Sequence, residues 1–141
     1  MDLSAMDLSA AGLRAQRERM TLIATNLANV DTTSARHETI RGADGETYTR
    51  HIPYRRQVAV LVQGRDGAPS VRVTQDASEF RVEHLPDHPH ASPGEGTVSF
   101  PNVNTLVETV DLIAASRAYE ANLTAMEVTK SMNQSALRIL G

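Results

Sequence analysis

Apolar side chains in the first 30 residues recur at alternating steps of four and three, the spacing of a helical seam. Ser4 and Asp7 have the spacing of a capping box, and the polar residues 29–33 are typical of a helix end. We therefore predict a helix over residues 4–29. The seam positions are Met6, Ala10, Leu13, Arg17, Met20, Ala24 and Leu27, and Ile23 and Val30 widen the apolar face.

The C-terminal segment carries a longer stripe with no polar interruption, which predicts a second helix. Thr105 and Glu108 resemble a capping box, and Glu108 and Asp111 lie where a helix N-terminus favours acids. The helix greatly exceeds the usual ~12 residues, so we expect something outside the chain to cover part of its stripe. The stripe consists of Val103, Val107, Val110, Ala114, Ala118, Ala121, Ala125, Val128, Met132, Ala136 and Ile139.

Residues 34–101 contain all six prolines and show no helical period. Runs rich in β-branched residues predict short antiparallel strands, whereas the polar stretch 35–53 is expected to be a loop. The predicted fold is α+β, with two long terminal helices pairing as an antiparallel coiled coil around a small β-rich insert. The predicted strands are 57–63, 70–74, 80–83 and 97–100, and the predicted regions are 1–33, 34–101 and 102–141.

Composition excludes several kinds of site. The chain has no cysteine, so it forms no disulfide and has no thiolate nucleophile. Its net charge of −3 opposes phosphate-backbone binding as the main function. No apolar run reaches the ~20 residues that span a bilayer, so no membrane insertion is expected. Asp2 and Asp7 replace the basic and apolar regions of a secretory signal, so no cleaved signal is expected.

The sequence offers one candidate for a metal site. His84, Asp87, His88 and His90 are residue types that ligate transition metals. Several prolines interrupt this segment, so no regular element fixes the geometry that a metal requires. A solvated polar loop is favoured and no metal, cofactor or catalytic residue is predicted; a metal-dependent hydrolase is the alternative.

A basic patch lies between residues 48 and 56, where arginines alternate with aromatic residues. Such a patch can bind single-stranded nucleic acid, but the net charge opposes this, and Arg and Tyr are also frequent in protein interfaces. We expect a surface patch that contacts protein. Its members are Arg50, His51, Arg55 and Arg56, with Tyr48 and Tyr54.

Asparagines gather at both helix ends that flank the insert. Asn26 and Asn29 lie near the end of the first helix, and Asn102 and Asn104 precede the second. If the helices are antiparallel, these side chains meet at one end of the pair and bind exposed backbone groups there. Simple helix stops and caps explain them equally well.

The chain resembles the bacterial flagellar basal-body rod protein family, and within it the proximal-rod proteins. The resemblance rests on SAMDLSAAGLRAQRERMTLIATNLANVDTT at 4–33 and PNVNTLVETVDLIAASRAYEANLTAMEVTKSM at 101–132, with PYRR at 53–56 and HPHASPGEGTV at 88–98. The family motifs carry over to Leu13, Asn26, Asn29, Val30, Asn102, Asn104, Arg117, Ala118, Tyr119 and Asn122.

This resemblance implies a non-enzymatic structural subunit of the periplasm-spanning rod. It implies export through the flagellar type III apparatus without signal cleavage, an inner domain of paired terminal helices and an outward-facing insert. The implied partners are proximal and distal rod subunits and the basal-body adaptor at the rod base. A coiled-coil adaptor unconnected with flagella shares the helix pattern and stays an alternative.

Overall fold

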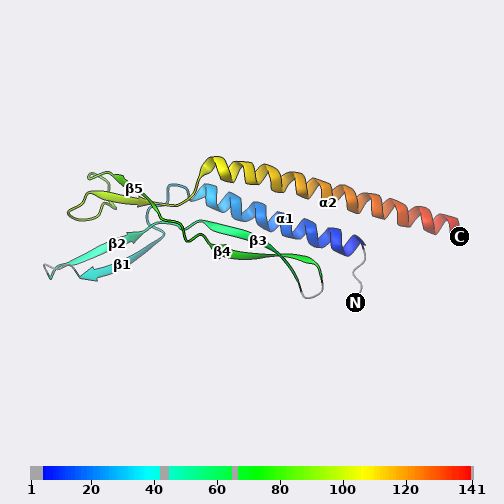
Figure 1. Cartoon of the computed structure of the whole chain (residues 1–141), viewed down its shortest axis with the longest axis horizontal. Helices are drawn as coiled ribbons and strands as arrows, with labels where there is room; N and C mark the ends of the chain where they lie inside the picture. Colours follow the sequence, from blue (N-terminus) through cyan, green and yellow to red (C-terminus); the bar gives the residue numbers. More distant parts are fainter. Residues whose placement is uncertain (1–4, 42–44, 65–66, 141) are drawn as a thin grey trace. The chain divides into compact units, whose positions relative to one another are not determined.

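The computed structural model describes residues 5–41, 45–64 and 67–140. Along the chain, one helix precedes six strands and a second helix follows them, and Figure 1 shows these elements. Three two-stranded sheets form from neighbouring strands, so the observed fold class is α+β. The elements are α1 (Ala5–Ala28), β1 (Arg36–Arg41), β2 (Thr47–Ile52), β3 (Gln57–Gln63), β4 (Pro69–Gln75), β5 (Arg81–His84), β6 (Thr97–Phe100) and α2 (Thr105–Leu140).

The chain divides into two compact units, and the division falls within both helices. Unit 1 comprises residues 1–24, 58–74 and 109–141, and unit 2 comprises residues 25–57 and 75–108. Each unit is therefore built from segments that are distant in the sequence.

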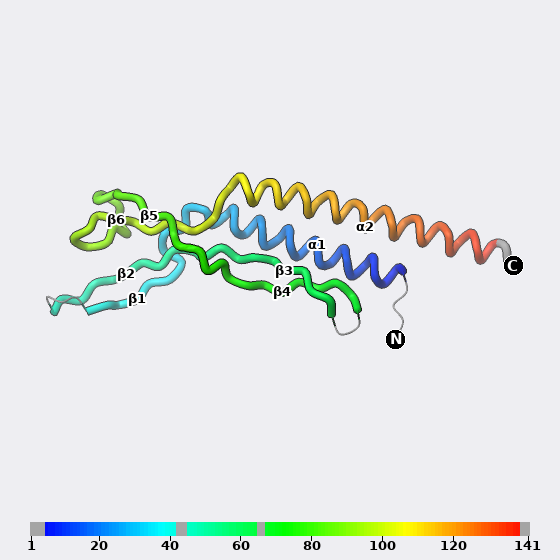
Figure 2. Tube along the Cα trace, in the orientation of Figure 1, coloured from blue at the N-terminus to red at the C-terminus, as the bar shows by residue number. Residues whose placement is uncertain are grey.

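In unit 1, α1 and α2 run side by side in opposite directions, and the β3–β4 hairpin lies along α1 (Figure 2). Ala11, Ala15 and Ala115 are buried there, and their small side chains let the neighbouring elements approach closely. Arg19 and Asp111 form an ion pair of 3.1 Å from one helix to the other. Such partly exposed pairs contribute at most about 1 kcal/mol, so packing of small residues dominates.

In unit 2, two sheets have a defined antiparallel register. Arg36 pairs with Ile52 in the β1–β2 sheet, and Arg81 pairs with Phe100 in the β5–β6 sheet. Every described β1 side chain is exposed, whereas Val98 of β6 is buried. The largest buried side chains of this unit include Asn26 and Glu108, so its interior is partly polar.

The helix prediction is confirmed within a residue at the ends of α1, and the second predicted helix is present as α2, Thr105–Leu140. The strand predictions at 57–63 and 97–100 match β3 and β6. Ser4, the expected first cap, lies outside the described residues.

The prediction of a loop over residues 35–53 is wrong, because the segment forms the β1–β2 hairpin. The β-branched and aromatic residues Ile40, Tyr48 and Thr49 favour strands, and Gly45 adopts the positive φ that the turn requires. Their polar neighbours concealed this preference, since both faces of the hairpin are largely exposed.

Gly12 marks a close approach of the two helices. A methyl group built on Gly12 would lie 3.0 Å from Oδ1 of Asn122. Replacing glycine by alanine inside a helix ordinarily stabilises it by about 1 kcal/mol. Here Asn122 must move to accept the methyl group.

We predict that Gly12→Ala raises the free energy of unfolding by clearly less than about 1 kcal/mol in the native chain. In the Asn122→Ala chain, where the methyl group meets no side chain, the same substitution should raise it by about 1 kcal/mol. Urea unfolding followed by circular dichroism measures both arms of this double-mutant cycle. Equal gains in the two backgrounds would show that the helices do not touch at this position.

Candidate functional site

The amide of Asn26, near the end of α1, is the centre of a hydrogen-bonded cluster in unit 2. Its Nδ2 donates to the Gln57 carbonyl at 2.8 Å and to Oε2 of Glu108 at 3.0 Å. Its Oδ1 accepts the Gln57 N–H at 3.0 Å and the Tyr54 hydroxyl at 2.9 Å. All four hydrogen-bonding positions of this amide are thus occupied.

Glu108, in the first turn of α2, is a buried acid with two partners. Only 1% of the residue is exposed, and its Oε1 accepts a hydrogen bond of 2.6 Å from Nε of Arg56. The same guanidinium also reaches Oδ2 of Asp76 at 3.2 Å. A buried carboxylate requires such partners, because removing its charge from water costs several kcal/mol.

Asn102 connects this cluster to the segment that follows β4. Its Oδ1 accepts the Arg56 N–H at 2.9 Å, and its Nδ2 donates to Oγ of Ser78 at 2.8 Å. The Asp76 N–H donates in turn to the Arg56 carbonyl at 2.9 Å. We use the name polar junction for the set Asn26, Tyr54, Arg56, Asp76, Asn102 and Glu108.

The contacts of the polar junction shift the pKa values of three of its members, Tyr54, Arg56 and Asp76. Burial by itself would lower the pKa of Arg56, but its bonds to Glu108 and Asp76 raise that pKa above the ordinary value. The pKa of Asp76 is lowered, mainly by hydrogen bonds from Ser78 and then by the bond from Arg56. Burial and the nearby charge of Glu108 raise the pKa of Tyr54. Arg56 and Asp76 are therefore held charged, and Tyr54 is held neutral.

The other two motif asparagines terminate the helices. Oδ1 of Asn104 accepts the N–H groups of Leu106 and Val107 at 3.0 and 3.2 Å, which is the geometry of an N-cap. Nδ2 of Asn29 donates to the Thr25 carbonyl at 2.8 Å, near the end of α1. Both proposed roles of asparagine therefore occur, with Asn26 and Asn102 joining backbone segments and Asn29 and Asn104 serving helix ends.

One prediction about this region is wrong. Asn104 supplies the capping oxygen expected from Thr105, and Glu108 contacts Arg56 and Asn26 instead of completing a capping box. The basic patch is open only in part, because Arg50 is exposed whereas Arg56 belongs to the polar junction, and its contact with protein stays a prediction. Arg55 donates to the Asp76 carbonyl at 2.9 Å and lies over the Phe80 ring.

The structure places the predicted α2 stripe away from the intramolecular contacts. Its members from Val107 to Met132 are exposed, except for half-buried Ala118. The less exposed face of α2 is formed by residues that mostly follow the stripe residues by one position, which places this face about 100° around the helix from the stripe. That face consists of Glu108, Leu112, Ala115, Tyr119, Asn122, Met126 and Thr129.

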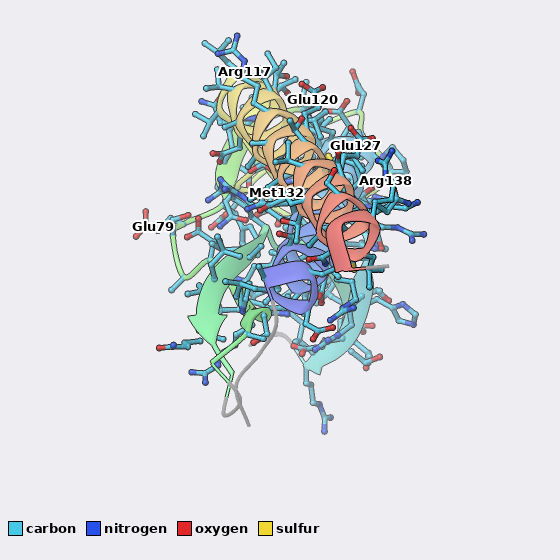
Figure 3. All side chains as sticks on the ribbon, turned by 90° about the vertical axis from the view of Figure 1, so that its right-hand side faces the viewer. Glu79, Arg117, Glu120, Glu127, Met132 and Arg138 are labelled. Atoms are coloured by element: carbon cyan, nitrogen blue, oxygen red, sulfur yellow. The ribbon has the colours of Figure 1, made fainter. Side chains whose placement is uncertain are left out.

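The predicted α1 seam is covered to a different degree. Ile23 is buried, and Met6, Leu13, Met20, Leu27 and Val30 are half-buried. The motif residue Arg117 is exposed, and with Glu120 and Glu127 it lies on the side of α2 turned away from α1 (Figure 3).

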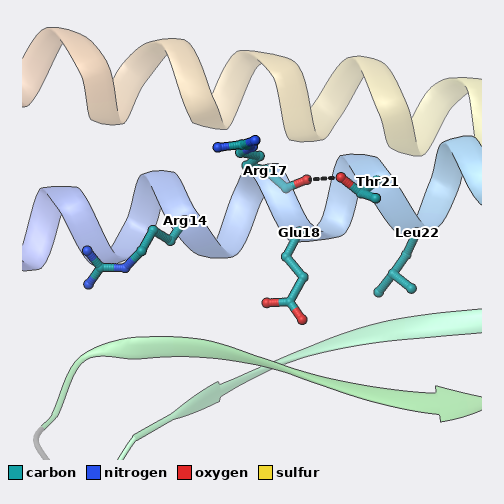
Figure 4. Close-up of a pocket in the computed structure, with 5 residues that line it drawn as sticks. All are labelled: Arg14, Arg17, Glu18, Thr21 and Leu22. Carbon is teal, nitrogen blue, oxygen red and sulfur yellow. Dashed lines mark hydrogen bonds between the residues drawn. The ribbon is translucent and has the colours of Figure 1, made fainter.

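Depressions in unit 1 suggest no chemistry. One, of about 390 Å³, is lined by the α1 residues Arg14, Arg17, Glu18, Thr21 and Leu22, and Thr21 donates to the Arg17 carbonyl (Figure 4). A single helix supplies all of these residues, so they do not enclose a substrate. Across residues 5–41, 45–64 and 67–140, no three His, Asp or Glu side chains are placed to hold a metal ion.

Comparison with known proteins identifies the family. Residues 95–139 match the family model described as the C-terminal part of flagellar basal body rod FlgEFG proteins. The flagellar basal-body rod protein FlgC of Bacillus subtilis is 37% identical, with 95% of each chain covered. The FlgC proteins of Aquifex aeolicus and Borreliella burgdorferi are 35% and 37% identical, with at least 92% of each chain covered.

The chain belongs to the FlgC family of flagellar basal-body rod proteins. This family is structural, which places the chain among the rod subunits of the flagellar basal body and not among enzymes. Membership also implies assembly with other flagellar components. Neither described helix of this FlgC relative is long and apolar enough to cross a membrane.

Sequence reasoning missed Tyr54, Arg56, Asp76 and Glu108 as partners of the motif asparagines. One signal was available for Glu108, which shares the helical face of Leu112, Ala115 and Tyr119 and is therefore expected to be buried. A charged residue on such a face needs a partner of opposite charge. Its identity depends on tertiary contacts, because Arg56 is 52 residues away in the chain.

For this FlgC-family chain we predict that Glu108→Gln lowers the free energy of unfolding by about 2–3 kcal/mol, because Arg56 then loses its buried counter-charge. The matched control Glu127→Gln changes an exposed acid of the same helix and should shift stability by less than about 0.5 kcal/mol. Chemical unfolding at neutral pH measures both variants. A similar small change in the two would mean that the polar junction does not stabilise unit 2.

Proposed function

We propose that this chain forms part of the proximal rod, the torque-transmitting drive shaft, and assembles through its terminal helices. The observation that carries this proposal is the exposed α2 stripe. Val110, Val128 and Met132 are 59%, 52% and 67% exposed. Apolar side chains that recur at helical spacing on an exposed face are typical of a surface that another helix covers.

The end of α2 supports the same proposal. All side chains from Lys130 to Arg138 are exposed, including Leu137 at 70%. These residues form an overhang, by which we mean the segment 130–138 that no other described part of unit 1 covers. Burial of apolar surface is worth about 25 cal/mol per Å², so neighbouring subunits gain free energy by covering it.

We propose further that α1 and α2 pair as an antiparallel coiled coil. The approach of Gly12 to Asn122 and the Arg19–Asp111 pair support this, since the partner position decreases along α2 as it increases along α1. In this arrangement residues 1–33 and 102–141 form the inner assembly domain, and residues 34–101 form the outer insert. The exposed stripe then lies beside the pairing seam and stays open to other subunits.

The proposed partners are proximal and distal rod subunits and the adaptor at the rod base. Export through the type III apparatus without signal cleavage would deliver the chain to a periplasm-spanning site. Assembly and folding are coupled in this proposal, because uncovered helix faces offset little of the chain entropy lost on ordering.

We predict that Val128→Asp prevents incorporation into basal bodies, because it places a charge in a subunit contact that is otherwise apolar. Thr109→Asp is the matched control, since it adds the same charge to an exposed site of α2 about 100° around the helix from Val128 and outside the overhang. Swimming motility and the amount of subunit in isolated basal bodies measure the effect.

Circular dichroism of the purified variants separates assembly from folding. Both substitutions are at exposed positions, so helix content should equal that of the native chain. Equal incorporation of the two variants would contradict the assignment of the stripe as the assembly surface.

A further inference from the structure

Three histidines meet in unit 2, where they take no part in the polar junction or the α2 stripe. His51 belongs to β2, and His88 and His90 belong to the 85–96 loop that joins β5 to β6. The rings of His51 and His90 are stacked, with centroids 4.1 Å apart and an angle of 26° between their planes. His88 packs edge-on against His90 at 5.3 Å. The stack therefore joins the loop to β2.

Hydrogen bonds fix each ring. Nδ1 of His90 shares a bond of 2.8 Å with the Thr33 hydroxyl, and Nδ1 of His51 shares one of 2.8 Å with the Ser34 hydroxyl. The backbone N–H of His90 donates to the ring nitrogen Nδ1 of His88 at 3.0 Å. This last bond needs a lone pair on Nδ1, so it exists only while that nitrogen of His88 carries no proton.

The surroundings supply little compensating charge. A cavity of about 850 Å³ borders His51 and His90, and among the described residues that line it only Arg50 and Glu95 are charged side chains besides the histidines. His37 of β1 lies opposite His51 in the strand register. His84 precedes the loop in the chain, and Asp87 lies within it. The described lining of the cavity therefore contains a single carboxylate, that of Glu95, together with Arg50 and two histidines.

We propose that the His51–His90 stack is a pH-operated latch, which holds the 85–96 loop on β2 while both rings are neutral and releases it when acid charges them. Two imidazolium rings at this separation repel each other, and Arg50 adds to the repulsion. Protonation of His88 also removes the acceptor of the His90 N–H. The same acidification thus weakens the stack that joins the loop to β2 and a hydrogen bond within the loop.

Ionisation of His90 gives the direction of the effect. Burial, and then the charges of His51 and His88, lower the pKa of His90 below its ordinary value. The released loop therefore binds protons more readily than the latched loop does. The contribution of the latch is complete above the ordinary histidine pKa of about 6.5 and decreases as the pH falls from there toward the lowered value.

Hydrogen exchange of the full chain at pH 7.5 and 5.0, corrected for intrinsic rates, tests the latch. Between pH 7.5 and 5.0, the equilibrium constant for opening of the 85–96 amides should rise. The rise should be up to about tenfold for each unit by which the histidine pKa is lower in the latched loop than in the released loop. His51→Gln should make opening at pH 7.5 easier and its pH dependence clearly smaller. The control His84→Gln, outside the stack, should keep the native response.

NMR titration of the histidines in the native chain gives a second readout that does not depend on a variant. The midpoint of His90 should lie below the ordinary histidine pKa of about 6.5. Opening that does not change with pH, an equal pH response in His51→Gln, or a His90 midpoint at or above the ordinary histidine pKa of about 6.5 would each overturn the proposal.

Discussion

The buried carboxylate of Glu108 is the constraint on which unit 2 depends. An acid removed from water at the first turn of α2 must be paired, and the chain pairs it with Arg56 and with the amide of Asn26. These two partners come from a connecting segment and from the last turn of α1. A single desolvated charge thereby specifies how three segments distant in the sequence meet, in a unit whose apolar core is small.

Unit 1 solves a different problem, since four of the five buried hydrophobic residues in its described part are alanines. Ala11, Ala15 and Ala115 permit close contact but each buries little area, so this packing leaves other apolar side chains of α2 uncovered. The side chains of the polar junction are hydrogen-bonded within the chain, whereas apolar side chains of α2 are exposed to solvent. A subunit with this combination is suited to assembly. The open surface gains its stabilising burial only from neighbours.

The sequence predicted both helices and several strands because periodicity is a local property. The β1–β2 hairpin escaped prediction, since its exposed strands lack apolar alternation. The α2 stripe was recognised correctly as apolar, but the face used inside the chain lies one position away and includes Glu108, Tyr119 and Asn122. Polar residues at buried positions interrupt the pattern that periodicity detects. The polar junction itself depends on contacts between residues at least 20 positions apart, such as Arg56 and Glu108, which no local pattern contains.

Hydrogen exchange of the free subunit and of the assembled rod, compared amide by amide, tests the central claim most directly. The account predicts that the overhang, residues 130–138, exchanges rapidly in the free subunit and slowly in the rod. Amides in the last turn of α1 and the first turns of α2 that adjoin the polar junction should be protected in both states. Strong protection of the overhang in the free subunit, or no gain of protection there on assembly, would contradict the account.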